Sequence, residues 1–272
     1  MKKIKKVLVK LRIFFEKLIS KIQFKYFLPY FLLASIAIFM AVSSYYYVIP
    51  MYHGYLREQR EIKSLKNKIR IDYEKVSIFK IIASFNSGLS GVKEKKVANL
   101  IFNMGERYKI NPALILAVIR VESSFNNFSY SDKGAVGLMQ IRPVTGLYLI
   151  KKYGIKSKKF NYNVKYMEYL PVNYLYNPSL NIKIGVRYLL SLLYEFKNLK
   201  FALFAYNAGP TLAHRTLNSA GKSARLSYSE STNRLFSDFY YGYYKRVKKY
   251  FAIYNKDIFT GNPATIGNAY SE

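Results

Sequence analysis

One acidic residue stands on an otherwise apolar helical stripe, which is the arrangement in this sequence best suited to acid–base chemistry. Residues 112–125 read PALILAVIRVESSF, and Glu122 follows Ile119, Val118 and Ile115 by three, four and seven residues. Residues at these spacings share one face of a helix. Desolvation on that face and the negative end of the helix both disfavour an ionised carboxyl, so we expect its pKa to be raised. A carboxyl that stays protonated near neutral pH can act as a general acid.

Two further segments could form a ligand cleft beside this acid. Residues 131–140 (SDKGAVGLMQ) contain two glycines within four positions, which permits a tight loop, and Gln140 carries both an amide donor and an acceptor. Residues 205–210 (AYNAGP) end a helix with Gly-Pro. Taken singly, each pattern also fits an ordinary turn or helix stop. By itself, Glu122 also fits a carboxylate at the edge of a core helix, paired with one of the many basic side chains.

Apolar periodicity and capping residues predict the helices that must position these groups. Asn111 precedes Pro112 as an N-cap, and Gly154 and Gly209 follow predicted helix ends. Few segments alternate as strands do, and the sequence has no internal repeat. The fold class predicted is therefore all-α. The predicted helices cover residues 92–108, 112–125, 143–153, 179–196, 199–208 and 238–254.

The composition excludes several kinds of site and indicates the charge of a partner. The chain has no Cys, which excludes disulfides, Cys-ligated metals and thiol catalysis. Its two His, His53 and His214, are far apart, so we expect neither a metal site, nor a serine-type triad, nor a cofactor. A net charge of +29 predicts an anionic partner, which could be nucleic acid, lipid headgroups or an acidic polymer.

The N-terminus predicts a membrane anchor. Residues 1–25 hold nine Lys or Arg and one acid, whereas residues 26–56 hold no Asp, Glu, Lys or Arg. Residues 26–48, at a rise of about 1.5 Å each, extend roughly 35 Å and could cross a hydrocarbon core of about 30 Å. A cleaved signal peptide is the alternative, but its apolar region is normally shorter. The basic segment should stay in the cytoplasm, and the residues after the apolar segment should lie on the other side of the membrane.

The predicted domain layout follows from these patterns. It consists of a basic cytoplasmic segment (1–25), a transmembrane helix (26–49), a membrane-proximal helical stalk (50–90), a globular domain (91–254) and a tail (255–272). The breaker-rich residues 84–91 (SFNSGLSG) mark the boundary between stalk and domain.

Four short segments of the predicted domain occur in a characteristic order. They are residues 122–125 (ESSF), residues 137–141 (GLMQI) with Pro143 and Thr145, Asn177-Pro178 with Asn181, Ile182 and Gly185, and residues 205–210 (AYNAGP). Together they resemble the catalytic domain of SLT-type lytic transglycosylases (glycoside hydrolase family 23), which are relatives of goose-type lysozyme. Gln140 lies 18 residues after Glu122, as in the family pattern. The resemblance covers about residues 92–254 and implies a lysozyme-like fold.

The resemblance implies that Glu122 is the sole catalytic carboxyl. It would protonate the glycosidic oxygen between N-acetylmuramic acid and N-acetylglucosamine, then activate the muramic C6 hydroxyl and so leave a 1,6-anhydro end. This is a substrate-assisted exception to glycosidases with two carboxylates. The resemblance also implies that the hydroxyl of Tyr206 points toward Glu122 or the substrate acetamide.

The resemblance further implies a set of residues that bind substrate or support the cleft. Ser131 and Gln140 would bind sugar groups beside Tyr206, and Met139 and Asn207 would support the cleft. Ser123 is expected to pack and form hydrogen bonds rather than act as a nucleophile, since no His accompanies it. This sequence departs from the family pattern in two places. The family often has a Glu followed closely by a Tyr near the C-terminus, and here Asp238 or Tyr243 could serve in that place. The Tyr-rich residues 156–176 form either a rim of the cleft or a solvated insertion.

The favoured function is a membrane-anchored lytic transglycosylase in the bacterial inner membrane, with its N-terminus cytoplasmic and its catalytic domain periplasmic. Its expected partners are peptidoglycan glycan strands, the membrane through residues 26–49, and cell-wall or secretion-machinery proteins, but not nucleic acid. Two alternatives stay open. One is a hydrolytic muramidase in which Asp132 positions water, and the other is a non-catalytic wall-binding assembly protein.

Overall fold

The computed structural model describes residues 9–17, 24–155, 172–219 and 238–259. The predicted rim segment, residues 156–176, lies largely outside the described residues, as does most of the predicted tail. The chain divides into two compact units, residues 1–68 and 69–272.

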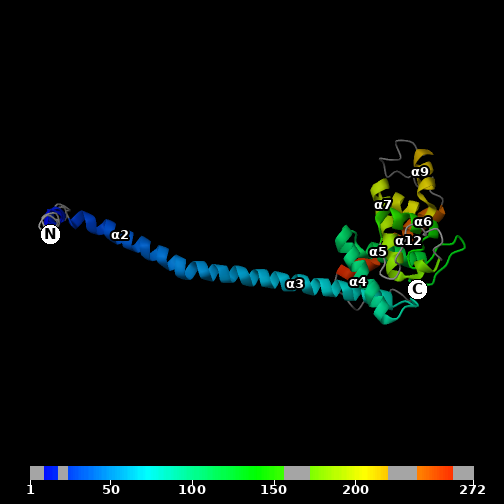
Figure 1. The fold of residues 1–272 in the computed structure, drawn as a ribbon, viewed down its shortest axis with the longest axis horizontal. Helices are drawn as coiled ribbons and strands as arrows, with labels where there is room; N and C mark the ends of the chain where they lie inside the picture. Colours follow the sequence, from blue (N-terminus) through cyan, green and yellow to red (C-terminus); the bar gives the residue numbers. More distant parts are fainter. Residues whose placement is uncertain (1–8, 18–23, 156–171, 220–237, 260–272) are drawn as a thin grey trace, which may run out of the picture. The chain divides into compact units, whose positions relative to one another are not determined.

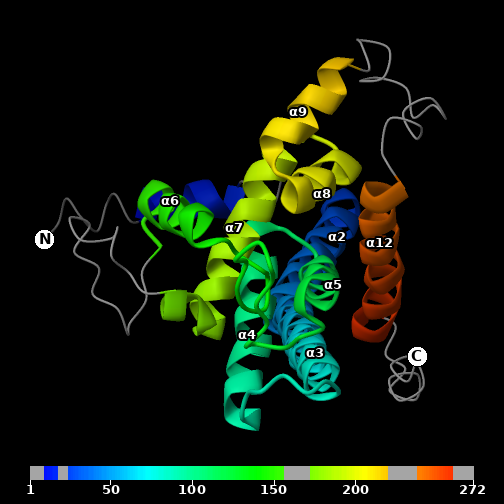
Figure 2. The same cartoon turned by 90° about the vertical axis from the view of Figure 1, so that its right-hand side faces the viewer.

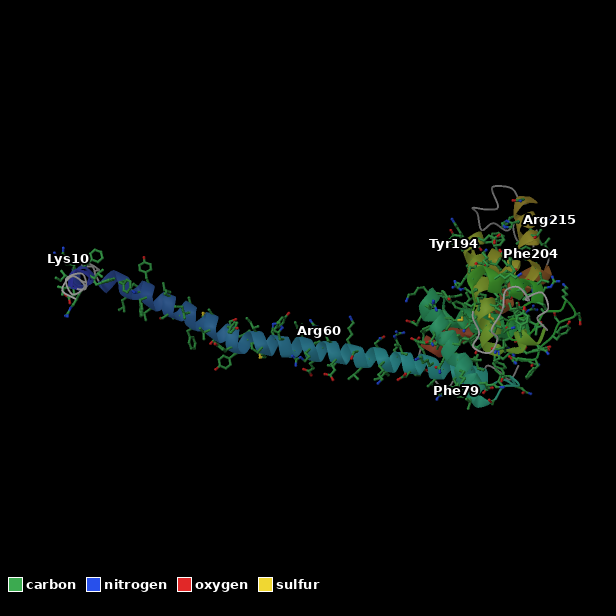
Figure 3. All side chains as sticks on the ribbon, viewed as in Figure 1. Lys10, Arg60, Phe79, Tyr194, Phe204 and Arg215 are labelled. Carbon is green, nitrogen blue, oxygen red and sulfur yellow. The ribbon has the colours of Figure 1, made fainter. Side chains whose placement is uncertain are left out.

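The N-terminal unit is helical, its first part is apolar, and its last helix continues into the second unit. Helix α2 (Phe24–Ser43) passes through a short π-helical turn, η1 (Ser44–Val48), into α3 (Ile49–Ala83). Among the described residues this is the one helical run that is long and apolar enough to cross a membrane; its best window has a mean hydropathy of 1.9, and none of that window is buried in the protein. In Figure 3, side chains such as that of Arg60 project outward along this run. The predicted apolar N-terminal helix is therefore present, and its place in a membrane stays a prediction.

The second unit is helical, as predicted. The described residues form no strand, and their only bridges pair Val136 with Tyr130 and with Ile141. Helix α9 follows Gly209 directly and was not expected from the sequence. The helices are α4 (Gly91–Tyr108), α5 (Pro112–Ser123), α6 (Pro143–Tyr153), η3 (Val172–Tyr176), α7 (Pro178–Phe196), α8 (Leu199–Ala208), α9 (Pro210–Ser219) and α12 (Asp238–Phe259), shown in Figure 1.

Local capping chemistry explains where several of these helices begin and end. The side chain of Asn111 accepts a hydrogen bond from the backbone N–H of Ala113 at 2.9 Å, and Pro112 occupies the first turn of α5. Asn177 caps α7 in the same way, accepting from Leu180 N–H at 3.0 Å. The predicted start of α5 is confirmed, and α7 begins one residue before its predicted start.

Helix α5 forms the centre of the core and is covered on several sides. Its residues from Pro112 to Ile119 are all buried. Helix α12 packs along α5, α4 also contacts α5, and α7 packs against α8 (Figure 2). The end of α3 contributes Ile78, Ile81 and Ile82, each at most 2% exposed, so the last part of the predicted stalk belongs to this core. Each fully buried aliphatic side chain contributes about 1.5–3 kcal/mol to folding.

Candidate active site

The carboxyl of Glu122 is presented at the end of the central helix. Glu122 lies in the last turn of α5, which ends because Ser124 and Phe125 both adopt left-handed backbone conformations, with φ of 51° and 65°. The strained turn is held by Phe125, which is 1% exposed and stacks on Phe85 with ring centroids 4.6 Å apart. Glu122 itself is only partly buried, and the turn that follows it fixes the backbone on which its carboxyl is carried.

A tyrosine from the last helix holds this carboxyl. The hydroxyl of Tyr243, on α12, donates a hydrogen bond of 2.6 Å to Oε1 of Glu122. The two residues are 121 positions apart and meet because α12 packs along α5. Tyr243 is 2% exposed, and burial together with the charge of Glu122 raises its pKa well above the ordinary value. The phenol therefore stays a neutral donor.

The surroundings of Glu122 raise the pKa of its carboxyl to a value near neutral pH. Burial raises its pKa to about 7, while the hydrogen bond from Tyr243 and the positive charge of Arg246 act in the opposite direction. The raised pKa predicted from the apolar stripe is confirmed, with desolvation as its main cause. A carboxyl with this pKa can both give and take a proton near neutral pH.

The loop that follows α5 is held in place by buried side chains. Ser123 Oγ donates to the carbonyl of Leu138 at 2.8 Å, which ties α5 to the loop. Asn181, fully buried on α7, donates to the carbonyls of Val136 at 2.8 Å and Leu175 at 3.0 Å, and accepts from Met139 N–H at 2.8 Å. Ser123 thus has the structural role expected from the sequence, and the backbone of the loop is fixed beside Glu122.

The hydroxyl of Tyr206 does not bond to Glu122, which was one of the two directions expected for it. It donates to the carbonyl of Met139 at 2.8 Å, and the hydrogen bond to Glu122 comes from Tyr243 instead. Tyr206 is nevertheless close enough for the charge of Glu122 to contribute, after burial, to raising its pKa well above the ordinary value. The ring of Tyr188 lies 5.1 Å from that of Tyr206 between centroids. Tyr206 therefore supports the loop directly and the carboxyl only at a distance.

The other expected site residues lie around the same loop. Met139 is fully buried and packs over Gly185, so its side chain supports the site from inside the core. Gln140, at a φ of 46°, donates through Nε2 to the carbonyls of Ser129 and Gly137 at 3.1 and 3.0 Å. This amide therefore closes the loop, while the residue remains partly exposed.

Two expected residues lie near the surface. Ser131 Oγ accepts from Ala135 N–H at 3.0 Å and is partly exposed, whereas Asn207 is exposed near the end of α8. Asp238 begins α12, but its side chain lies outside the described residues.

Sequence reasoning named Tyr243 only as one of two candidates and missed the roles of Arg246 and Asn181. Tyr243 could not be selected from sequence because the chain has 28 Tyr and the contact is made across the fold. In the described ranges, no group of three or more His, Cys, Asp or Glu could hold a metal ion. The arrangement is one titratable carboxyl, a neutral phenol donor and a rigid loop, which suits proton transfer to and from a bound substrate.

Comparison with known proteins shows which family the globular part of the chain resembles. Residues 99–228 match the pattern of the family described as "Transglycosylase SLT domain". The "Soluble lytic murein transglycosylase" of Escherichia coli K12 is 34% identical over 163 residues, which cover 59% of this chain and 23% of that protein. The "Membrane-bound lytic murein transglycosylase C" of Actinobacillus pleuropneumoniae is 36% identical over 106 residues, covering 39% of this chain and 26% of that protein.

Solved structures give the same relationship. The 70 kDa soluble lytic transglycosylase Slt70 from Escherichia coli superposes with a TM-score of 0.50 at 28% identity, covering 63% of this chain and 25% of the other. An inactive Glu-to-Gln mutant of the lytic transglycosylase Slt from Pseudomonas aeruginosa has a TM-score of 0.50 at 25% identity, covering 61% and 25%. The chain thus spans about a quarter of the length of these relatives.

Proposed function

We propose that this chain, which carries an SLT transglycosylase domain homologous to soluble and membrane-bound lytic murein transglycosylases, is a membrane-anchored peptidoglycan lytic transglycosylase. The observation that carries the proposal is the single carboxyl of Glu122, with a pKa of about 7 and a hydrogen bond from Tyr243, inside that domain. A Glu-to-Gln change inactivates the homologous Slt of Pseudomonas aeruginosa, and we propose Glu122 as the corresponding group here.

In the first step, the protonated carboxyl of Glu122 gives its proton to the glycosidic oxygen between N-acetylmuramic acid and N-acetylglucosamine. The bond from that oxygen to C1 of the muramic residue breaks, and the N-acetylglucosamine side leaves with the proton. The substrate's own acetamide stabilises the positive charge at C1. The carboxylate left on Glu122 is stabilised by the hydroxyl of Tyr243, which already donates to Oε1 at 2.6 Å.

In the second step, the carboxylate of Glu122 takes the proton from the muramic C6 hydroxyl. The oxygen attacks C1 and closes the 1,6-anhydro ring, and Glu122 returns to its protonated form. Neither step consumes water. A pKa near 7 suits this cycle because the same group must act first as an acid and then as a base at one pH.

We propose that Ser131, Gln140 and Asn207 contact the sugars, since all three are partly or fully exposed around the loop beside Glu122. Tyr206 and Met139 act from behind this surface, through the hydrogen bond between the Tyr206 hydroxyl and the Met139 carbonyl. Their function is to hold the loop in the conformation that receives the substrate.

The decisive experiment is digestion of purified sacculi by the full chain in detergent, followed by mass analysis of the muropeptides. We expect products whose muramic end is one water lighter than a hydrolysed reducing end. Reducing ends of full mass would support a muramidase, in which Asp132 is the candidate to position water. No cleavage, together with retained binding, would support a non-catalytic wall-binding protein.

Tyr243→Phe is expected to move the alkaline limb of the activity profile to higher pH and to lower the maximal rate about tenfold. The hydrogen bond from Tyr243 lowers the pKa of Glu122, so its loss raises that pKa and keeps the acid protonated to higher pH. Initial rates of sacculus digestion between pH 5 and 9 measure this effect. Tyr206→Phe is the matched control, because it removes a buried hydroxyl that donates to Met139 instead. An equal shift in both variants would contradict the assignment.

We further propose that residues 26–49 anchor the chain in the bacterial inner membrane, with the catalytic domain in the periplasm, where it would meet peptidoglycan and cell-wall or secretion-machinery proteins. The support is the exposed apolar run that includes α2, and a homologue described as membrane-bound. Protease added to intact spheroplasts should digest the domain. Its protection there would rule out this topology.

A further inference from the structure

A row of alternating cations and aromatic rings crosses three helices of the globular unit. We call it the cation–aromatic row. Its members, in spatial order, are Tyr148, Lys152 and Tyr153 on α6, Arg187 on α7, and Tyr108 and Arg107 on α4.

The α6 end of the row is organised around Lys152. Its Nζ lies 5.4 Å from the ring centroid of Tyr148 and 5.5 Å from that of Tyr153. It also donates to the hydroxyl of Tyr148 at 3.2 Å, and this hydrogen bond raises the pKa of Lys152 above its ordinary value. Lys152 and Tyr148 are exposed, so the ammonium of Lys152 stands on the surface in a place set by two rings.

Arg187 joins the helices. Its guanidinium lies 4.4 Å from the ring centroid of Tyr108 and 5.1 Å from that of Tyr153, so one side chain of α7 stacks on rings from α4 and α6. Arg107 lies over Tyr108 at 5.6 Å and extends the row along α4. Stacking occupies the faces of a guanidinium and leaves its N–H edge able to bind a carboxylate with two hydrogen bonds.

The charge of the row is not neutralised by the protein around it. Throughout the described part of the chain, no carboxylate forms an ion pair with Arg107, Lys152 or Arg187. Cations held in place without a counter-charge lose less side-chain entropy when an anion binds, which favours binding.

The α6 end of the row lies away from the helix whose tyrosine holds Glu122. Figure 2 shows α6 and α12 on opposite sides of the globular unit, with α5 and α7 between them. Tyr243 on α12 is the residue that holds Glu122, so the α6 end of the row lies on the other side of the unit from that contact.

We propose that the cation–aromatic row is a second binding surface for the peptidoglycan strand, which takes the carboxylates of its peptide stems while another part of the strand is bound at Glu122. This inference rests on the proposed function. A polymer with repeated carboxylates matches several cations that are connected through shared rings on three helices. Nucleic acid fits less well, because base stacking needs open ring faces, whereas Tyr108 and Tyr153 are each already approached by two cations.

The test measures binding of the full chain in detergent to insoluble sacculi by co-sedimentation. All proteins carry Glu122→Gln so that the strand is not cut. We expect the double change Lys152→Gln and Arg187→Gln to weaken binding about tenfold at low salt, about threefold for each lost cation, and to reduce the dependence of binding on salt. Arg187→Lys keeps the charge but loses the planar stacking group, so we expect its binding to sacculi to be weaker than that of the parent and stronger than that of the double variant.

The matched control removes two exposed lysines of α4 that have no such stacking, Lys93→Gln with Lys96→Gln, and should bind nearly as the parent does. Thermal unfolding verifies that each variant is folded. Equal binding by the double variant and the control would overturn the proposal. The proposal would also be overturned if the double variant bound sacculi as the parent does but no longer bound vesicles of phosphatidylglycerol. The row would then serve a lipid surface.

Failure of the proposed function is seen separately, in the chain that retains Glu122. There the double variant should cut a short, peptide-free glycan at the parent rate and cut sacculi more slowly. If the parent chain cuts neither substrate, the proposed function fails, while the binding result still decides whether the row holds the strand.

Discussion

Glu122→Gln is expected to lower the rate of glycan cleavage by about a thousandfold or more, with binding to sacculi retained. The amide keeps the shape of the side chain and can still accept the hydrogen bond from Tyr243, but it cannot give a proton to the glycosidic oxygen. Because the proposed cycle uses the same group as acid and then as base, both steps are lost together. Release of soluble muropeptides from sacculi measures the rate, and co-sedimentation measures binding.

The same variant should unfold at higher temperature than the parent above neutral pH. The folded pKa of Glu122 is raised to about 7, so the folded state holds the proton more tightly than the unfolded chain does. Stability of the parent therefore falls as pH rises from about 4.3, the ordinary glutamate value, to about 7, and the penalty is complete above that. Glu122→Gln removes a penalty of up to about 3 kcal/mol at pH 8 and none of it at pH 4.

Asp132→Asn is the matched control for the loss of activity. Asp132 is an exposed carboxyl in the neighbouring loop, and no step of the transglycosylase cycle uses it. We expect this variant to keep most of the parent activity. If its activity were lost while Glu122→Gln retained cleavage, the assignment of the acid would be wrong.

The helices were predictable because their ends are set by neighbouring residues. Asn111 followed by Pro112 starts α5, and Gly154 ends α6, as their side chains and backbone preferences dictate. The apolar stripe placed Glu122 for the same reason, since a helix periodicity is local. Such features need no knowledge of which helices pack together.

The partners of the acid were less predictable because they depend on how distant helices pack. Tyr206 and Tyr243 are both buried phenols close to Glu122, yet only Tyr243 reaches it, because Tyr206 instead bonds to Met139. The sequence separation of these contacts, 67 and 121 residues, exceeds anything that a periodicity can report. The family resemblance brought both tyrosines into consideration, but the direction of each hydroxyl required the structure.

The loop beside the acid shows how a short motif combines local and distant requirements. Gly137 has a φ of 80°, which the sequence anticipated as a tight turn. Its contact with α7 was not anticipated, since a Cβ at this position would lie 2.5 Å from Asn181 Nδ2 and 2.8 Å from the carbonyl oxygen of Leu175. The same Asn181 holds the loop by two hydrogen bonds, to Val136 and Met139, and bonds to Leu175 of η3 by a third, so the glycine and the asparagine require one another.

Gly137→Ala is therefore expected to destabilise the protein by about 3 kcal/mol, roughly 1 from the left-handed backbone and the rest from displacing Asn181 and a backbone carbonyl. For a domain of this size the midpoint of thermal unfolding should fall by about 10 °C, and cleavage should fall with it as the loop moves. Gly134→Ala is the control, because its φ of 73° is similar but the nearest atom to its Cβ, the Tyr130 hydroxyl, is 3.7 Å away. Equal melting of the two variants would show that close approach to Asn181 is not what requires glycine at position 137.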